Sequence, residues 1–307
     1  MRILAAGGAG FLGRHLCRKL RETDPELQLT ILDLQGKTGF NFTQCDLTNR
    51  TDSRLALSSD SFQTVIQMVG IIRAKSVQEY RLLNVETTEI LLENLDPPPD
   101  KFLLLSSSAV YGAPSSDHWP VKETCSLNPV SDYGVSCIER EELARRICRQ
   151  KGIKLVILRP FNLVGPGQEP VMMVPSFAQR LALIERNGFP LEMEVGPLDT
   201  RRDFVDVRDA AGFIAAAALS RDPSEEQVYN IASGVTHTGR YVLDHLLEIF
   251  SLPTQFLIRE GSSVTGGAVV RDLPGDSTHA GNSLGLRISI PLEESLEDVA
   301  NDWRERT

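Results

Sequence analysis

The sequence of 307 residues contains few cysteines and histidines and has no long hydrophobic run. Its five cysteines are odd in number, and none stands in a CxxC or Cys/His ligand spacing, so we predict neither a disulfide framework nor a metal site. No apolar segment approaches the roughly 20 residues that cross a bilayer, and the N-terminal MRILAAGGAGFLG is too rich in glycine for a signal peptide. We therefore expect a cytoplasmic protein that does not enter a membrane.

The sequence also has fewer positively charged than negatively charged residues. The chain has 32 Lys and Arg against 41 Asp and Glu, which gives a formal net charge of -9 and a pI near 5.2. Proteins whose main task is to bind nucleic acid usually present a basic face to the phosphate backbone. The composition argues against a nucleic-acid partner, and an anionic small molecule would need local basic residues instead.

Short apolar runs alternate with helical periodicity through the first half of the chain. We expect buried strands at 2–6, 29–32, 65–69, 101–105 and 154–158, and helices at 14–21, 80–95 and 138–149. Alternation of this kind is typical of a parallel sheet with helices on both faces. The expected class is therefore α/β, with a Rossmann-type parallel sheet.

Three glycines directly follow the first expected strand and open the first expected helix. They are Gly7, Gly10 and Gly13 in GGAGFLG. A pyrophosphate can lie on a helix N-terminus only where no side chain blocks the approach to the backbone. The motif predicts a dinucleotide site, although the motif alone leaves open a plain glycine-rich turn.

Two further positions strengthen the prediction of a dinucleotide site. Asp33 ends the second expected strand 20 residues beyond Gly13, where a carboxylate can accept hydrogen bonds from the adenosine ribose. Asp46 and Leu47 follow a third short strand, where a side chain can flank the adenine. Because Asp33 would repel a 2′-phosphate, NAD(H) is favoured over NADP(H); a turn aspartate without a ligand is the alternative.

The pattern changes after Pro160, where a GPGQ turn leads to a helix expected at 174–185. Residues 260–289 are expected to be rich in loops, and 227–231 to return to the main sheet. We expect a dinucleotide-binding domain at 1–164, joined by 201–232. A smaller C-terminal substrate-binding lobe is expected at 165–200 and 233–307, over the strand ends.

At this point the sequence resembles the extended short-chain dehydrogenases/reductases of the NAD-dependent epimerase/dehydratase family, which modify nucleotide sugars. The motifs that carry the resemblance are GGAGFLG (7–13), Asp33, Asp46-Leu47, NVETT (84–88), SSSAVYG (106–112), DYGVS (132–136), RPFNLVGPGQ (159–168), RRDFVDVRD (201–209) and VYNIASG (228–234). The stretch from 159 to 209 is most similar to GDP-4-keto-6-deoxymannose reductases. The resemblance implies an NAD cofactor, a nucleotide-sugar substrate and a homodimer formed by the helices near 80–95 and 138–149.

The resemblance also implies catalytic roles. Tyr133 corresponds to the tyrosine that exchanges a proton with the sugar hydroxyl, and Ser107 to the hydroxyl that hydrogen-bonds the same oxygen. Ser107 ends an expected strand, so a serine that merely closes the strand is the alternative. The matched motifs supply further cofactor contacts, which are Phe11, Leu12, Val69, Tyr133 and Pro160.

Cys137 stands four residues after Tyr133, where the family has a lysine that holds the nicotinamide ribose and lowers the tyrosine pKa. A neutral thiol supplies no cation, and a thiolate would raise the pKa of Tyr133. Alcohol oxidation needs an ionised tyrosine, whereas ketone reduction starts from the protonated one, so reduction tolerates the loss better. Cys137 as a nucleophile is a sharper alternative, but no histidine lies nearby in sequence to activate it.

Other departures lie around the expected cofactor. Ala6 replaces the threonine that the family usually has, and QMVG (67–70) replaces a run similar to His-Leu-Ala-Ala. Together with Cys137, these make three changes around one site, which suggest an altered or lost reaction. They keep open a catalytically silent member that binds dinucleotide or sugar nucleotide, and an epimerase or dehydratase that does not need the lysine.

The substrate side is predicted from the second half. Asn162 and Gln168 flank a Gly-Pro-Gly turn, and their amides can hold a sugar or a diphosphate. Arg202 matches the family arginine that meets the substrate phosphates, with a solvated surface charge as the alternative. Val174 is a candidate by resemblance at the start of a helix, and Ser108 by its place in the serine triplet. We expect an NAD(H)-dependent reductase of a nucleotide-linked 4-keto-deoxysugar.

Overall fold

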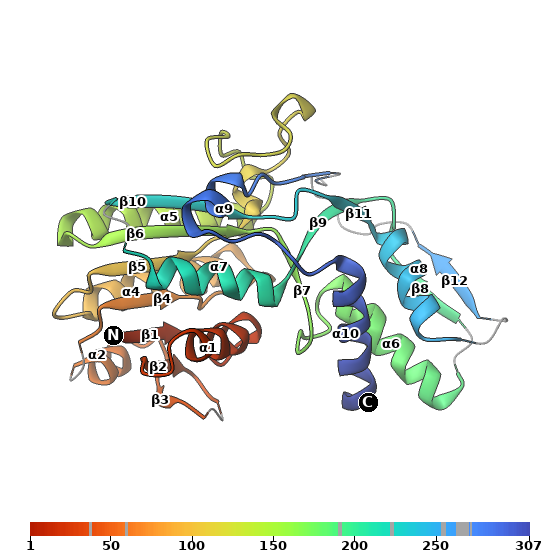
Figure 1. Cartoon of the computed structure of the whole chain (residues 1–307), viewed down its shortest axis with the longest axis horizontal. Helices are drawn as coiled ribbons and strands as arrows, with labels where there is room; N and C mark the ends of the chain where they lie inside the picture. The colour runs from red at the N-terminus through yellow and green to blue at the C-terminus, as the bar shows by residue number, and fades with distance from the viewer. Residues whose placement is uncertain are drawn as a thin grey trace.

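The computed structural model describes residues 1–36, 39–58, 61–189, 192–221, 224–252, 256–261, 270 and 272–307. These residues form a seven-stranded parallel sheet with helices around it (Figure 1). From edge to edge the strands are β10 (Glu226–Ile231), β6 (Lys154–Pro160), β5 (Lys101–Leu105), β4 (Thr64–Gln67), β1 (Arg2–Ala6), β2 (Gln28–Asp33) and β3 (Asn41–Gln44). The expected Rossmann-type sheet and the return of the chain near 227–231 are confirmed.

The strand order reverses direction between β1 and β4. Ala6, the last residue of β1, pairs with Leu32 of β2 on one side and with Gln67 of β4 on the other. In open parallel sheets the crevice at such a switch point, beyond the carboxyl ends of the strands, is where ligands bind. The glycine-rich turn after β1 and the turn after β4 therefore face the same crevice.

Helices cover both faces of the sheet because successive strand residues point to opposite sides. In β1, Ile3 and Ala5 pack into one apolar core, and Leu4 and Ala6 pack into another. The first core includes residues of α1 (Phe11–Thr23) and α7 (Val207–Leu219). The second includes residues of α2 (Arg50–Leu57), α4 (Thr87–Asn94) and α5 (Asp132–Lys151).

Helix α5 carries the tyrosine of interest and has well-formed ends. At its start the Gly134 amide donates to Ser131 Oγ at 3.1 Å. At its end Gly152 takes a left-handed conformation with φ 67°, which ends the helix. Cys137 and Ala144 lie on its buried face, so the helix phase against the sheet is fixed.

The helix expected at 80–95 is less regular than its pattern indicates. It consists of α3 (Val77–Tyr80), a π-helical segment η1 (Arg81–Glu86) and then α4. Asn84 lies in the π-helical segment, where its Oδ1 accepts from the Ile71 amide at 2.7 Å and its Nδ2 donates to Ser136 Oγ at 2.9 Å. Single π turns inside helices frequently mark functional sites.

The smaller lobe lies beside the strand ends (Figure 1). Its elements are α6 (Met173–Asn187), β8 (Glu192–Val195), α8 (Gly239–Ile249), β12 (Leu257–Glu260) and α10 (Leu292–Arg306). Phe177, Leu246, Phe250 and Trp303 are buried in its core. The helix expected at 174–185 is present with slightly longer bounds.

Two segments depart from the expected division. The strand β9 (Arg201–Asp206) does not join the main sheet but forms a three-stranded sheet with β7 (Asn162–Val164) and β11 (Thr236–Thr238). Helix α9 (Thr278–Leu284), inside the stretch expected to be loops of the smaller lobe, packs through Ala280 on the core of the main sheet. The other proposed boundaries remain predictions.

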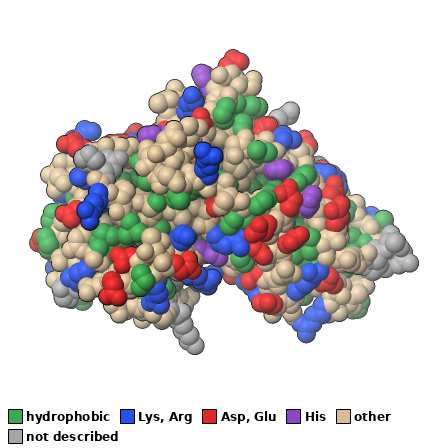
Figure 2. All heavy atoms as spheres, in the orientation of Figure 1, with side chains coloured by type: hydrophobic (Ala, Val, Ile, Leu, Met, Phe, Trp, Pro, Cys, Tyr) green, Lys and Arg blue, Asp and Glu red, His purple; other side chains and the backbone are tan. Residues whose placement is uncertain are grey.

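Two short 3-10 helices, η2 (Ser108–Tyr111) and η3 (Ser116–His118), complete the secondary structure of the described residues. Figure 2 shows that positive and negative side chains are interspersed on the visible face. In the part of the chain that the structure describes, no helix is both long and apolar enough to span a membrane.

Candidate functional site

A cavity of about 430 Å³ lies at the carboxyl ends of β4, β5 and β6 and reaches the smaller lobe. It brings together nine residues singled out from the sequence, which are Phe11, Leu12, Ser107, Ser108, Tyr133, Pro160, Asn162, Gln168 and Arg202. Residues from distant parts of the chain thus meet where ligands of this sheet topology bind. This cavity is the candidate active site.

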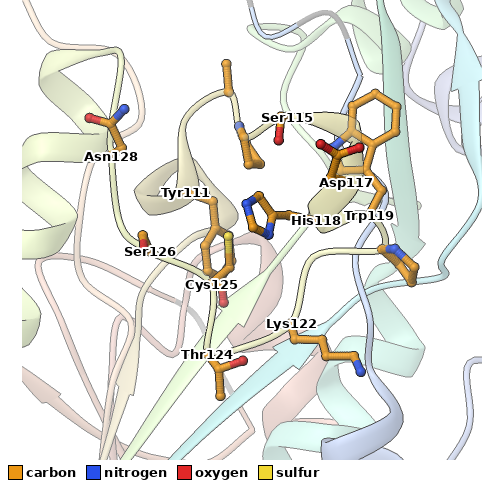
Figure 3. Close-up of a pocket in the computed structure, with 13 residues that line it drawn as sticks. Tyr111, Ser115, Asp117, His118, Trp119, Lys122, Thr124, Cys125, Ser126 and Asn128 are labelled. Atoms are coloured by element: carbon orange, nitrogen blue, oxygen red, sulfur yellow. The ribbon is translucent and has the colours of Figure 1, made fainter.

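A larger cavity of about 710 Å³ is formed mainly by the loop after η2 (Figure 3). The rings of Tyr111 and His118 face it together with the side chain of Cys125. None of the predicted catalytic, cofactor-binding or substrate-binding residues lines it. The smaller cavity is therefore the better candidate for chemistry.

The glycine-rich turn fits a dinucleotide pyrophosphate. Gly7 has φ +81°, and a Cβ there would come within 2.9 Å of the Val69 amide nitrogen. A Cβ on Gly13 would lie 2.4 Å from the Gly7 carbonyl oxygen, so both positions require glycine. Gly10, the N-cap of α1, would meet only the Gly7 carbonyl, at 3.3 Å. Its other side is open, and there backbone amides at a helix N-terminus can receive an anion.

Asp33 lies at the end of β2, against this turn. Its Oδ2 accepts from the Ala9 amide at 3.0 Å and its Oδ1 accepts from the Leu34 amide at 2.8 Å. A carboxylate oxygen has more than one lone pair, so both oxygens can still accept from ribose hydroxyls. The glycine-rich turn and Asp33 together therefore fit a dinucleotide.

The other predicted cofactor residues lie farther from the cavity. Asp46 Oδ1 accepts from the amide and the hydroxyl of Thr48, which forms a local turn. Leu47 is buried in the core under α2 and α4. Val69 contacts the turn through its backbone beside Gly7. An adenine contact by Asp46 or Leu47 stays a prediction.

The serine triplet after β5 places each hydroxyl differently. Ser106 is buried and donates to Glu141 Oε1 at 2.5 Å. Ser107 caps η2, where its Oγ accepts from the Ala109 amide at 3.2 Å, and its hydroxyl lies close enough to the phenol of Tyr133 to lower the pKa of that phenol. Ser108 lines the cavity next to it. Ser107 and Tyr133 are thus in direct contact, as the family motif implies.

Tyr133 lies in the first turn of α5 with its phenol directed to Ser107 and Cys137. Burial raises the pKa of Tyr133, and the neighbouring Cys137 raises it further. The hydrogen bond from Ser107 and the positive charge of Arg140 lower this pKa but do not offset the burial. The phenol is therefore protonated throughout the neutral pH range.

Cys137 is 2% exposed and packs in the main core. Burial raises the pKa of its thiol to about 11, although Arg140 acts in the opposite direction. The protonated, buried thiol argues against the nucleophile hypothesis. Cys137 is therefore a small packed helix residue that supplies no cation.

Several cavity residues were not predicted from the sequence, among them Gly70, Asn84 and Arg140. Gly70 and Asn84 lie in the quoted runs QMVG and NVETT, but no role was assigned to them. Arg140 lies on α5, and its guanidinium donates to the carbonyl oxygens of Val69 and Gln67 at 3.2 and 3.3 Å. The available signal was its helical phase, because Arg140 lies seven residues after Tyr133 and thus on the same face.

The substrate side of the cavity contains polar groups from the second half. Gln168 is nine-tenths buried; its Nε2 donates to the Leu163 carbonyl, and its Oε1 has no hydrogen-bond partner. Asn162 Nδ2 donates to the Asp203 carbonyl at 3.1 Å. Arg202 donates to the Val270 carbonyl at 2.8 Å, and burial lowers its pKa. Arg202 is therefore in the cavity and not a solvated surface charge.

Val174 does not line the cavity. Its side chain is 3% exposed and packs in the core of the smaller lobe, because the phase of α6 turns this position inward. A ligand contact through its side chain is therefore not supported. The neighbouring Met172 lines the cavity instead.

The GPGQ turn is fixed by both of its neighbours. The Arg14 guanidinium of α1 donates to the Gly167 carbonyl at 3.0 Å, and the Gly167 amide donates to Asp302 of α10 at 2.9 Å. Gly167 itself has φ +84°, a conformation that favours glycine. The turn thus positions Gln168 relative to both the main sheet and the smaller lobe.

A buried polar network supports the catalytic side. Arg159 of β6 forms a salt bridge with Glu141 of α5 at 2.7 Å, and Glu141 also accepts from Ser106. Arg159 further donates to the hydroxyl of Tyr111, which donates to Asn230 of β10 at 2.7 Å. The network ties α5 to β6 and β10 and, through Ser106, to the residue that precedes Ser107.

Comparisons with known proteins agree with this geometry. The profile of the family described as "NAD dependent epimerase/dehydratase family" matches residues 3–232. A GDP-6-deoxy-D-mannose reductase of Pseudomonas aeruginosa is 28% identical over 67% of this chain and 66% of its own length. A dTDP-6-deoxy-L-talose 4-dehydrogenase (NAD(P)(+)) of Kitasatospora kifunensis is 28% identical over 97% of this chain and 94% of its own.

The fold comparison covers the whole molecule. The UDP-glucuronic acid 4-epimerase of Bacillus cereus, solved with UDP-glucuronic acid and NAD, superposes with a TM-score of 0.86 at 25% identity, and all of each chain is covered. The family profile spans well over half of the chain and includes the glycine-rich turn, Asp33, Ser107 and Tyr133. The chain therefore belongs to the NAD-dependent epimerase/dehydratase family of enzymes.

Proposed function

We propose that the protein reduces the 4-keto group of a nucleotide-linked deoxysugar, with NADH as the hydride source. The observation that carries the proposal is the contact between a protonated Tyr133 and Ser107 at a cavity of about 430 Å³. A protonated phenol beside a second hydroxyl can hydrogen-bond one carbonyl oxygen and deliver a proton to it. The high pKa of Tyr133 suits a proton donor better than a base.

Each group at the site has a separate role in the proposed reaction. NADH, when bound, supplies a hydride to the carbonyl carbon. Ser107 holds and polarises the carbonyl oxygen, and the Tyr133 O–H bond breaks as a new O–H bond forms on the sugar. The glycine-rich turn would hold the pyrophosphate and Asp33 the adenosine ribose, since both lie at the switch-point crevice. Asp33 favours NADH over NADPH because its charge repels a 2′-phosphate.

The substrate class is inferred from the other wall of the cavity. Arg202 offers a planar cation for a diphosphate, and the unpaired Oε1 of Gln168 can accept from a sugar hydroxyl. Burying an acceptor without a partner is costly, so a ligand hydroxyl there would remove a penalty. The names of the two relatives, a 6-deoxymannose reductase and a 6-deoxytalose 4-dehydrogenase, favour a 6-deoxyhexose with a 4-keto group.

The test is NADH oxidation by the purified protein with 4-keto-6-deoxy sugars linked to GDP, dTDP and UDP, with NADPH run in parallel. We expect saturable turnover with at least one sugar nucleotide, and Ser107→Ala is expected to lower kcat about 100-fold or more. Binding of the sugar nucleotide with no turnover would favour the silent alternative. Turnover of the corresponding 4-hydroxy sugar without net NADH consumption would favour an epimerase.

The homodimer implied by the family resemblance is retained as a proposal. The helices concerned, α4 and α5, pack against each other on one face of the sheet. Leu82 and Val135 beside them are 39% and 42% exposed, while Arg50 and Arg146 form ion pairs with Glu89 on the same surface. Sedimentation velocity would test it, and a monomer at micromolar concentration would contradict it.

A further inference from the structure

The site lacks a lysine at position 137, but a second cation from the same helix reaches it. We propose that Arg140 supplies the fixed positive charge beside Tyr133 that Cys137 cannot supply, as a positioning residue that acts through Tyr133. The inference rests on the proposed function, in which Tyr133 donates a proton. It assigns a specific task to a residue outside the recognised motif.

Helical geometry brings Arg140 to the tyrosine. With about 100° of rotation per residue, seven residues fall about 20° short of two full turns, so Tyr133 and Arg140 share one face of α5. Cys137 lies between them on that face. Side chains on a helix lean toward its N-terminus, and a long arginine can therefore reach back along the stripe past the small thiol.

Contacts place the guanidinium at the edge of the cavity. Arg140 is 4% exposed and lines the cavity together with Tyr133 and Ser107. Its Nη1 donates to the Val69 carbonyl at 3.2 Å, and its Nη2 donates to the carbonyls of Gln67 and Leu105. Gln67 and Leu105 are the last residues of β4 and β5, and Val69 lies in the turn directly after β4, so the edge of the sheet holds the cation at the site.

Burying the charge of Arg140 without a carboxylate partner costs folding free energy, which suggests that the charge serves a function. A buried cation normally pairs with a carboxylate, because removing it from water has a large penalty. Among the residues that the structure describes, no carboxylate forms an ion pair with Arg140, and its buried Nε has no hydrogen-bond partner. Burial lowers the pKa of Arg140 accordingly. Arginine nevertheless keeps its charge in proteins, unlike a buried lysine.

The groups around the tyrosine hydroxyl have opposing effects on its pKa. On α5, Cys137 raises the pKa of Tyr133 and Arg140 lowers it; from the end of β5, Ser107 lowers it through a hydrogen bond. The ring of Tyr80 of α3 lies 6.1 Å from that of Tyr133. Arg140 is thus the one cation acting on Tyr133 among these neighbours. When Tyr133 gives its proton to the substrate oxygen, the guanidinium stabilises the phenolate until water returns a proton.

A measurement on the protein without substrate separates this proposal from the proposed function. All five tyrosines are replaced by 3,5-difluorotyrosine, which titrates at lower pH, and the Tyr133 resonance is assigned by ¹⁹F NMR with Tyr133→Phe. We expect Arg140→Gln to raise the pKa of the fluorinated Tyr133 by about one unit, and Arg140→Lys to raise it less, because the charge is kept.

Lys101→Met is the matched control. Lys101, the first residue of β5, is also a buried cation held by backbone carbonyls, those of Ala217 and Ser220; its ammonium group lies at the end of α7, and Lys101 does not line the cavity. Lys101→Met should lower the melting temperature without changing the pKa of the fluorinated Tyr133. If folded Arg140→Gln has the same Tyr133 pKa as the wild type, the proposal is overturned. The role of Arg140 would then be only to hold α5 to the strand ends through hydrogen bonds.

If Arg140→Gln does not fold, Cys137→Lys is compared with the double variant Cys137→Lys/Arg140→Gln. The added lysine replaces the lost cation in the fold, and the proposal still requires a higher Tyr133 pKa in the double variant. Equal values would overturn it. A shifted titration in a protein that turns over no sugar nucleotide would leave Arg140 confirmed and the proposed reaction rejected.

Discussion

The behaviour of Tyr133 depends on which charges lie within a few ångströms of its oxygen. Burial and Cys137 raise its pKa, whereas Ser107 and Arg140 lower it, and the net effect is a rise. Reduction needs the protonated phenol and oxidation needs the phenolate. The site should therefore run preferentially toward the alcohol at neutral pH, and only strongly alkaline solution should favour the reverse reaction.

Cys137→Lys tests this dependence at the residue scale. A lysine one helical turn from the tyrosine should lower the pKa of Tyr133 by about 1–3 units. Each unit raises the phenolate fraction about tenfold while the phenol stays mostly protonated, so oxidation at pH 8 should quicken by that factor. The alkaline limit of the reduction should move to lower pH. Initial rates in both directions across pH measure these effects.

Cys137→Ala is the control for that prediction, because it removes the thiol without adding a cation. It should keep the wild-type alkaline limit apart from the small effect of the lost thiol. If Cys137→Lys and Cys137→Ala give the same profiles, the charge at this position does not govern Tyr133, and the account of the missing lysine is wrong.

Motif residues and their neighbours differ in how well the sequence predicts them. Ser107, Tyr133 and Arg202 meet in one cavity, because strand ends and a helix start fix their positions. Arg140 was not anticipated, since an apolar stripe gives no reason to expect a charged residue facing carbonyl groups. Val174 was misplaced because the rotational phase of α6 is set by lobe packing, which one sequence does not reveal.

At the scale of elements, the turn between β1 and α1 should bind the dinucleotide through Gly10. Gly10→Ala should leave the fold intact, since its Cβ would meet only the Gly7 carbonyl at 3.3 Å. The same Cβ would occupy the approach to the helix N-terminus, so NADH affinity should fall about tenfold or more, about 1.4 kcal/mol. Titration calorimetry and melting temperature measure the two effects.

Gly196→Ala is the matched control, because a Cβ there meets nothing within 4 Å. Its NADH affinity should equal that of the wild type. A Gly10→Ala variant that binds NADH as tightly as Gly196→Ala would show that the pyrophosphate lies elsewhere.

The link between α5 and β6 predicts a stability effect with a defined pH dependence. Glu141 and Arg159 have side chains 0% and 3% exposed, so Glu141→Gln leaves a buried cation uncompensated and should cost about 3–5 kcal/mol of unfolding free energy at neutral pH. Denaturant unfolding measures it. Glu226→Gln, which loses a partly exposed ion pair with Arg145, should cost about 1 kcal/mol or less.

The sign of the pH effect follows from the pKa of Glu141. Burial raises this pKa, but the hydrogen bonds and charge of Arg159, with Ser106, outweigh burial and hold it below its ordinary value of 4.5. The stabilisation is therefore complete above pH 4.5 and lost as the pH falls through the lower folded-state pKa. Wild type should lose stability in acid more steeply than Glu141→Gln; parallel curves would contradict the linkage.

The elements themselves were predicted unevenly. The strands of the main sheet follow from apolar runs, because a strand buried on both faces leaves little choice of residue. The π-helical segment at Asn84 was not visible, since it depends on side-chain hydrogen bonds to Ile71 and Ser136 from other segments. Helix α9 has only seven residues, too few for a clear period.

At the scale of the whole molecule, the cavity joins the main sheet to the smaller lobe. A sugar nucleotide that contacts Tyr133 and Arg202 should therefore stabilise the folded state. At 100 times its Kd the free energy of unfolding should rise by about 2.7 kcal/mol, and the melting temperature should rise with it. Arg202→Gln should weaken sugar-nucleotide binding by about 1.5–3 kcal/mol and leave the NADH effect unchanged. Thermal shifts with each ligand measure both.

Arg201→Gln is the control at the neighbouring position, because Arg201 donates to Thr236 and pairs with Asp272 at 3.2 Å and is not among the cavity residues. It should keep the full sugar-nucleotide shift. Equal losses in both variants would mean that general charge, and not a contact of Arg202, attracts the ligand.

The division into lobes was predicted only in outline. The smaller lobe has its own apolar core, as the change of pattern after Pro160 indicates. The chain crosses between lobes through β7, β9 and β11, and these crossings depend on pairings between distant segments. Such long-range pairing leaves little trace in the periodicity of any single segment.

The most direct test of the account is the pH dependence of NADH-driven reduction of a 4-keto sugar nucleotide by wild type and Tyr133→Phe, with Tyr241→Phe of the smaller lobe as control. Because Tyr133 stays protonated, the wild-type and control kcat should be level from about pH 6 to about pH 9, and Tyr133→Phe should be slower by about 100-fold or more at every pH. Turnover by Tyr133→Phe at the wild-type rate would contradict the account.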